Sequence, residues 1–272
     1  MNDRFFNTIR AIVFFFLIWQ LLYLLSNYKQ LTTTFKEKED AYSSVVNSTL
    51  GFNSIQHIKL PNVTNHDRNQ HTLTLATGLQ RTQVECTFQE DDAGQVSLLL
   101  TRLRPHIQLW QEMVAKDIQT MLILETDAIW EESIKEVHWR VVRALNKLLS
   151  TSPAENDPYN SDSWDVISFG SCGGSELFSD ISVTFDDPDA ANDVYFGTPL
   201  NRQRVVRRAG YLACTTSYAI SQRGAKRMLL RSAMSPISSL DYTMGEMSVA
   251  GELDVFSVYP PTFKIDQPVN EN

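Results

Sequence analysis

The stretch Leu122–Trp130, LILETDAIW, decides the fold that we expect, because an apolar run ends directly on two carboxylates. Four successive apolar residues, 121–124, are typical of a strand buried on both faces of a parallel sheet. Glu125 and Asp127 follow with one residue between them, where the chain must turn before its next helix. Ligands of open α/β sheets bind beyond the carboxyl ends of the strands, so we look for chemistry at this turn.

Strand and helix patterns alternate on both sides of this stretch. Helices are indicated by apolar residues at three- and four-residue spacing, and strands by short apolar runs between turn residues. Ser221 is expected to cap a helix that runs to Ser232. The alternation predicts an α/β protein with a mostly parallel sheet covered by helices. The further strands are expected at 55–60, 164–169, 211–220 and 255–259, and the further helices at 72–79, 107–118 and 131–149.

The amino-terminal run 11–25, AIVFFFLIWQLLYLL, predicts one N-terminal transmembrane helix. We interpret residues 11–28 as a signal anchor that follows a cytosolic tail at 1–10. The alternatives are a cleaved signal peptide, although SNYKQ follows without a small-x-small pattern, and a buried core helix. The positive charges do not decide the orientation, because they lie on both sides of the run, at Arg4, Arg10, Lys29, Lys36 and Lys38.

Beyond the anchor, residues 29–51 are expected to form a polar stem and residues 52–272 a folded domain. Two glycosylation sequons begin at Asn47 and Asn62. Together with the anchor they favour a single-pass type II protein of the Golgi (or ER) membrane, with its C-terminal domain in the lumen.

Charge and cysteine content narrow the function classes. The formal net charge is −8 and no basic stripe reverses it, which argues against a nucleic-acid partner. Three cysteines are too few for a disulfide scaffold and lack zinc-site spacing. In an oxidising compartment they would allow one disulfide and one free thiol.

The spacing of Glu125 and Asp127 suits one hard cation, Mn²⁺ (or Mg²⁺), which prefers oxygen ligands and can bridge to a diphosphate. The alternative is structural, because acids are common in turns and at helix N-termini. A second candidate site is the run 204–210, RVVRRAG, whose arginines could hold an anion or could lie along a solvated strand edge.

Six segments, in order, resemble family 25 glycosyltransferases, the group of lipopolysaccharide and collagen galactosyltransferases, and most closely its fungal-type members. LETDA resembles the Leu-Glu-Asp-Asp-Ala signature of that family, with Thr126 in place of the middle Asp. The first segment departs as well, with Lys59 where the family has Asn. The resemblance covers roughly 55–268, and the other segments are 58–68 (IKLPNVTNHDR), 102–110 (RLRPHIQLW), 164–174 (WDVISFGSCGG), 214–229 (CTTSYAISQRGAKRML) and the closing pair 241–247 (DYTMGEM) and 259–263 (YPPTF).

The resemblance implies a GT-A-like fold with a nucleotide-sugar-binding sheet, and a metal-dependent glycosyltransferase activity. A hexose, galactose by the resemblance, would move from a nucleotide diphosphate sugar to a hydroxyl of a glycan or glycoprotein. Glu125 and Asp127 would bind the metal. Asp67 and Arg68 would bind the nucleotide, and a surface ion pair is the alternative for these two residues.

The family's late acid corresponds to Asp241, a candidate base for the acceptor hydroxyl, with Asp266 as the other late acid. The alternative for each is an ordinary loop acid. A disulfide between Cys172 and Cys214 fits the same pattern, and two buried free thiols are its alternative. Because of Thr126, the alternative function is a weakly active or inactive relative that acts as a sugar- or partner-binding membrane protein.

Overall fold

A computed structural model describes residues 15–16, 18–27, 39–59, 67–85, 98–170, 172, 181–235, 237 and 239–266. Within these residues, eight strands form one mixed sheet in the order β2-β1-β3-β10-β5-β11-β9-β6. The strands of this sheet are β1 (Ser54–Lys59), β2 (Thr82–Glu85), β3 (Thr120–Leu124), β5 (Val166–Ser168), β6 (Ser182–Asp186), β9 (Gln203–Arg208), β10 (Ser217–Ser221) and β11 (Val255–Tyr259).

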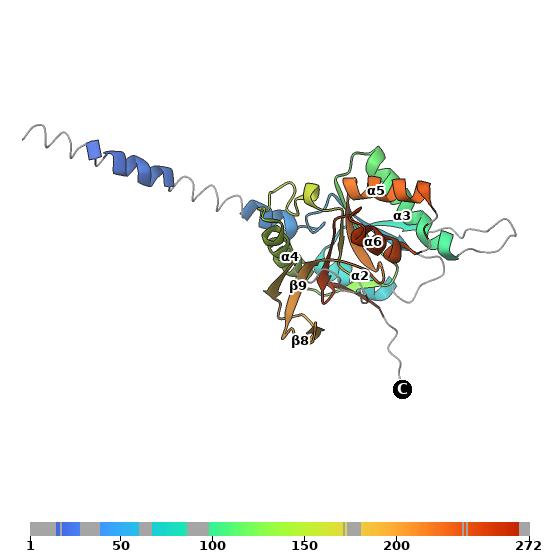
Figure 1. Ribbon diagram of the computed structural model, residues 1–272. Helices are drawn as coiled ribbons and strands as arrows, with labels where there is room; N and C mark the ends of the chain where they lie inside the picture. The colour runs from blue at the N-terminus through green and yellow to red at the C-terminus, as the bar shows by residue number, and fades with distance from the viewer. Residues whose placement is uncertain are drawn as a thin grey trace, which may run out of the picture.

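Helices cover both faces of the sheet, as the alternating pattern predicts (Figure 1). Alternate residues of β3 point to opposite faces, so Met121 and Ile123 join one core while Leu122 and Leu124 join another. The first core is closed by α3 (Leu98–Ala115), α5 (Gln222–Met234) and α6 (Leu240–Val249), and the second by α4 (Ile134–Leu149). The remaining elements are α2 (Asp67–Thr77), the 3₁₀ turn η1 (Ser161–Ser163), the pair β4 (Ala128–Trp130) and β12 (Phe263–Ile265), and the pair β7 (Val194–Tyr195) and β8 (Thr198–Pro199).

The prediction of a mostly parallel sheet is wrong. β1 runs parallel to β2 and to β3, and β5 runs parallel to β11, but the four other pairings are antiparallel. Parallel neighbours need a crossover connection, usually a helix. In the described part of the chain between β5 and β10 there are strands and turns but no α-helix, so β10 returns antiparallel to both of its neighbours. Of the expected strand 211–220, only 217–220 is strand.

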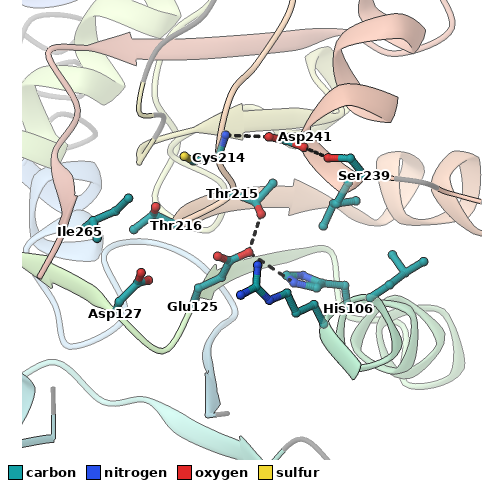
Figure 2. Close-up of a pocket in the computed structure, with 12 residues that line it drawn as sticks. His106, Glu125, Asp127, Cys214, Thr215, Thr216, Ser239, Asp241 and Ile265 are labelled. Atoms are coloured by element: carbon teal, nitrogen blue, oxygen red, sulfur yellow. Dashed lines mark hydrogen bonds and ion pairs between the residues drawn. The ribbon is translucent and has the colours of Figure 1, made fainter. Parts of the chain in front are cut away.

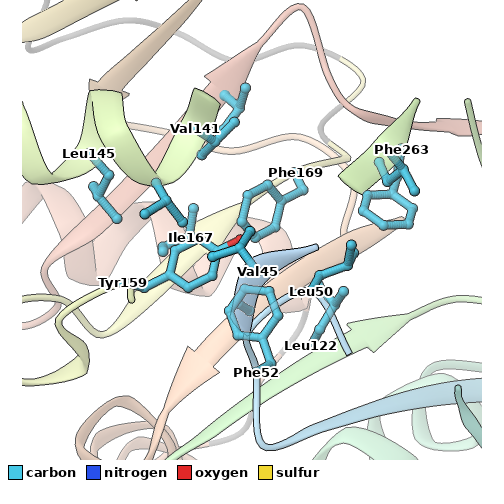
Figure 3. Packing of buried hydrophobic residues seen from close by; sticks show 14 of the residues in the cluster. Val45, Leu50, Phe52, Leu122, Val141, Leu145, Tyr159, Ile167, Phe169 and Phe263 are labelled. Atoms are coloured by element: carbon cyan, nitrogen blue, oxygen red, sulfur yellow. The ribbon is translucent and has the colours of Figure 1, made fainter. Parts of the chain in front are cut away.

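The packed domain reaches back into the expected stem. Residues 39–45 are helical, and the side chains of Ala41, Val45 and Leu50 are completely buried. Val45 and Leu50 belong to the core that α4 covers, where they lie among Phe52, Tyr159 and other residues of that core (Figure 3). This burial adds apolar contacts that a polar stem would not provide.

The expected anchor lies partly outside the described residues, because only 15–16 and 18–27 of its length are described. Those residues are helical, and their large apolar side chains are exposed. Within the described part of the chain, no helix combines the length and the hydropathy that crossing a membrane requires.

Candidate active site

The acidic motif forms a turn that is closed by its own backbone and held by α2. β3 ends at Leu124, and the Ala128 N–H donates to the Glu125 carbonyl at 3.1 Å before β4 begins. Gln70 of α2 is fully buried and donates from Nε2 to the carbonyls of Thr126, at 2.7 Å, and of Ala128, at 2.9 Å. Because unpaired buried carbonyls are costly, these two bonds fix the turn against α2.

Thr126 faces away from the two acids that flank it. Its hydroxyl donates to the Ile58 carbonyl of β1 at 3.0 Å, and the residue is only 5 % exposed. Glu125 and Asp127 instead line a cavity at this edge of the sheet. The departure at Thr126 therefore changes a buried position beside β1 and leaves both outer carboxylates on the cavity.

The cavity, of about 510 Å³, brings together the predicted metal pair and the predicted base. Figure 2 shows Asp241 across the cavity from Glu125 and Asp127. This position follows the rule for α/β sheets, since Glu125 comes directly after the carboxyl end of β3. The residues that line the cavity are Arg102, Leu103, His106, Glu125, Asp127, Cys214, Thr215, Thr216, Ser239, Leu240, Asp241 and Ile265.

Glu125 is surrounded by hydrogen-bond donors and positive charge. Its Oε1 accepts a short hydrogen bond from the Thr215 hydroxyl and lies 3.6 Å from His106 Nε2. Burial by itself raises the pKa of Glu125, but the hydrogen bond and charge of His106, the Thr215 hydroxyl and the charge of Arg102 outweigh it. The net pKa of Glu125 is lowered, so it is ionised at neutral pH.

Asp241 stands in the first turn of α6 and anchors the loop that enters β10. Its Oδ2 accepts from the Cys214 N–H at 2.8 Å. Its Oδ1 accepts from the Tyr242 N–H at 2.8 Å and from the Ser239 hydroxyl. Both carboxylate oxygens are therefore bonded, and Asp241 holds the chain at Cys214, whose φ of 65° lies in the left-handed region.

A disulfide joins Cys172 to Cys214, with Cα atoms 5.5 Å apart. The pairing that the family resemblance implied is thus confirmed, and the alternative of two free thiols is wrong. Cys172 N–H also donates to the Ala213 carbonyl at 2.9 Å. The disulfide and Asp241 together tie down the loop that forms one wall of the cavity.

The predicted nucleotide-binding pair, Asp67 and Arg68, begins α2, but its side chains lie outside the described part of the structure. The next residue, Asn69, donates from Nδ2 to the Asp266 carboxylate at 3.1 Å. Asp266 N–H donates in turn to the Asp127 carbonyl at 2.8 Å. The first turn of α2 is therefore linked through Asp266 to the backbone of the acidic motif.

The donor set fits a hard cation that a ligand would complete. Glu125 and Asp127 supply carboxylate oxygens to the same cavity. Among the described residues, no group of three His, Cys, Asp or Glu side chains is placed to hold a metal ion. Mg²⁺-type ions commonly use one or two carboxylates and take their other ligands from substrate phosphates and water.

Sequence reasoning missed several residues of the cavity wall. Arg102 and His106 come from α3, four residues apart and thus on one face of the helix, and both line the cavity. Thr215 lines it from the loop before β10. The sequence could have indicated these residues, because they lie within RLRPHIQLW and CTTSYAISQRGAKRML, two of the segments that resemble the family.

The run 204–210 is not a solvated edge. β9 lies between β11 and β6, and Arg204 is completely buried. The Arg204 guanidinium donates to Asp187 through Nε and, through Nη1, to the carbonyls of Pro260, at 2.8 Å, and Pro261, at 2.7 Å. These internal partners occupy Arg204, because a buried charge needs such pairing.

A sequence model described as "Glycosyltransferase family 25 (LPS biosynthesis protein)" matches residues 103–244, which is more than half of the chain. Comparison with curated proteins finds no significant match. Among solved structures, A197 from STIV is similar at 8 % identity and a TM-score of 0.37, covering 77 % of this chain and 83 % of that one. A glycosyltransferase involved in the glycosylation of the major capsid of PBCV-1 has 8 % identity and a TM-score of 0.38, with 80 % and 94 % covered.

Proposed function

The chain belongs to glycosyltransferase family 25, and from that membership we propose that it transfers a hexose, galactose by resemblance, from a nucleotide diphosphate sugar to a hydroxyl of a glycan or glycoprotein. The observation that carries this proposal is the convergence of Glu125, Asp127 and Asp241 on one cavity. We propose a GT-A-like arrangement, in which this edge of the sheet receives the nucleotide sugar.

Glu125 and Asp127 would hold Mn²⁺ (or Mg²⁺) with two carboxylates, leaving the remaining coordination positions to the donor diphosphate. When bound, such a cation supplies neutralisation of the charge that develops on the leaving diphosphate. Arg102 lines the same cavity, and its planar guanidinium is suited to phosphate oxygens. We assign it a donor-binding role beside the earlier candidates Asp67 and Arg68.

Asp241 is the proposed acceptor of the proton from the attacking hydroxyl. It is a carboxylate on the cavity wall across from the proposed cation ligands (Figure 2). A general base must lie within hydrogen-bond reach of the proton that it removes. Asp241 already accepts three hydrogen bonds, from Cys214 N–H, Tyr242 N–H and the Ser239 hydroxyl, so one lone pair of Oδ2 would remain for the acceptor.

The test is a screen of nucleotide sugars for Mn²⁺-dependent hydrolysis and transfer, with calorimetry of UDP binding. Asp127→Asn and Glu125→Gln should each lower the rate roughly 100-fold, as loss of a charged contact in the transition state requires. Glu136→Gln, on the exposed side of α4, is the matched control and should behave as the natural protein. If no donor is hydrolysed and Asp127→Asn leaves all nucleotide binding unchanged, the proposal fails.

The second candidate is a binding protein that has lost turnover. UDP and Mn²⁺ would then bind to the cavity, but neither hydrolysis nor transfer would occur. Thr126→Asp discriminates the two candidates poorly, because Thr126 faces Ile58 and not the cavity. Direct binding without turnover for every donor would favour the second candidate, whereas a membrane-tethered structural protein would bind no nucleotide.

We also propose that the domain lies in the lumen of the Golgi (or ER), behind an N-terminal anchor in a type II orientation. The exposed apolar side chains at 15–16 and 18–25 support the anchor, and the Cys172–Cys214 disulfide supports an oxidising compartment. Asn47 is exposed, and its Oδ1 accepts hydrogen bonds from Thr49 and Gly51. These bonds do not involve Nδ2, the atom to which a glycan would be attached.

Topology is tested by the gel mobility of the protein with and without glycosidase, compared with Asn47→Gln. The Asn62 sequon, which lies outside the described residues, is tested by Asn62→Gln in the same assay. An unglycosylated protein whose C-terminal domain is digested by protease added outside intact microsomes would overturn this topology.

A further inference from the structure

We propose that Tyr218 and His106 form a buried relay, one hydrogen bond followed by one longer polar contact, that decides which oxygen of Glu125 faces the cavity. This role would make them positioning residues for cation and diphosphate binding. The proposal rests on the proposed function, because it concerns the same site. Tyr218 Oη lies 2.8 Å from His106 Nδ1, and His106 Nε2 lies 3.6 Å from Glu125 Oε1. The relay therefore runs from β10 through α3 to the end of β3.

The direction of the relay follows from burial. Tyr218 is 1 % exposed, and burial raises the pKa of its phenol well above the usual value, so Oη keeps its proton. A neutral imidazole that accepts this proton at Nδ1 carries its own proton on Nε2, and a charged imidazole also has a proton on Nε2. Nε2–H then points at Glu125, whereas the other tautomer would set a lone pair against the carboxylate.

Packing holds the imidazole in this orientation. His106 is 3 % exposed, and its ring stacks on Tyr218 with centroids 5.7 Å apart and an interplanar angle of 25°. The Trp110 ring lies next to it at 6.4 Å. A ring confined in this way cannot turn freely, so the relay is set before any ligand enters.

The consequence is that the two oxygens of the Glu125 carboxylate have different roles. The Thr215 hydroxyl and His106 Nε2 both approach Oε1 of Glu125. Among the described residues, one hydrogen bond and one ion pair reach this carboxylate, both at Oε1, so Oε2 is available to the cavity. Glu125 would then bind a cation through one preoriented oxygen, and partners of this outer-shell kind typically change metal affinity 10- to 100-fold.

The experiment uses the purified full chain and titrates Mn²⁺, alone and with UDP, by calorimetry. Tyr218→Phe removes only the hydroxyl, and His106→Ala removes the donor to Glu125. Each should weaken Mn²⁺ binding about tenfold and raise the KM for the donor sugar more than it lowers kcat. His106→Gln, whose amide N–H can replace Nε2–H, should recover affinity to within about threefold of the natural protein.

The chain offers a matched control in Tyr159, whose Oη lies 2.8 Å from Nδ1 of the buried His138, in the core that α4 covers and outside the cavity. Tyr159→Phe removes the same kind of buried bond and should leave Mn²⁺ affinity unchanged. If Tyr218→Phe and His106→Ala bind Mn²⁺ as the natural protein does, or if Tyr159→Phe weakens binding equally, the relay is refuted. If the natural protein binds neither Mn²⁺ nor UDP, the proposed function fails and the relay with it.

Discussion

Acidification should destabilise this protein through His138, a buried histidine of α4. His138 is completely buried among aromatic rings, with Phe169 at 4.6 Å and Phe263 at 5.8 Å between centroids. Burial, with a smaller contribution from the charge of Arg204, lowers the pKa of His138 to about 3. The folded protein therefore keeps this imidazole neutral at pH values where the unfolded chain protonates it.

The sign and size of the effect follow from the two pKa values. The unfolded histidine has a pKa of 6.5, so above this pH neither state is protonated and the free energy of unfolding has its full value. As the pH falls from 6.5 toward 3, only the unfolded state binds the proton, and the free energy of unfolding falls. Each pH unit below 6.5 costs about 1.4 kcal/mol, so the free energy of unfolding should fall by about 2 kcal/mol between pH 7 and pH 5.

The assay is urea denaturation followed by tryptophan fluorescence at pH 7, 6 and 5. His138→Asn removes the titrating ring, so its free energy of unfolding should fall by about 2 kcal/mol less than that of the natural protein over this range. His71→Asn, at an exposed position of α2, controls for the loss of one imidazole and should follow the natural protein. Equal pH dependence for His138→Asn and the natural protein would refute the reasoning.

Three further predictions concern the residues that shape the site. Thr126→Asp should lower the free energy of unfolding by at least about 2 kcal/mol, because a buried hydroxyl donor is replaced by an acid facing a carbonyl. It should not raise turnover; urea midpoints measure the stability and donor hydrolysis measures the turnover. Cys172→Ser, which opens the disulfide to Cys214, should cost about 3 kcal/mol and loosen the cavity wall, so that the thermal midpoint and UDP affinity fall together; an unchanged affinity would contradict the second part. Gly224→Ala should destabilise by about 3 kcal/mol in chemical denaturation, because its Cβ would lie 2.3 Å from the Asp165 carbonyl oxygen; a stable variant would show that α5 can shift away.

The local order of elements and the position of the acidic turn could be predicted from the sequence, because both depend on short-range pattern. The run 121–124 is apolar at every position and forms the fully buried β3, and Val255–Tyr259 forms β11 with the expected bounds. The Ser221 hydroxyl accepts from the Gly224 N–H and caps α5 as predicted. Glu125 and Asp127 were found for the same reason, since they directly follow an apolar strand.

Only the tertiary structure decided how distant segments meet. No local pattern shows that β10 runs antiparallel between β3 and β5, since strand direction depends on how the intervening chain returns. Arg204 looked solvated because its partners, Asp187, Pro260 and Pro261, come from elsewhere in the sequence. The polar composition of 29–51 concealed Val45 and Leu50, whose burial depends on the core that α4 covers.

The same division applies to the site. The sequence by itself pointed to three carboxylates that line the cavity, because Glu125, Asp127 and Asp241 lie in recognisable segments. The tertiary structure decided their surroundings, since His106 meets Glu125 only where α3 packs beside the end of β3, and Tyr218 meets His106 only through β10. Residue type and spacing specify chemistry along the chain, but hydrogen-bond partners far apart in sequence are selected by the packing of the whole domain.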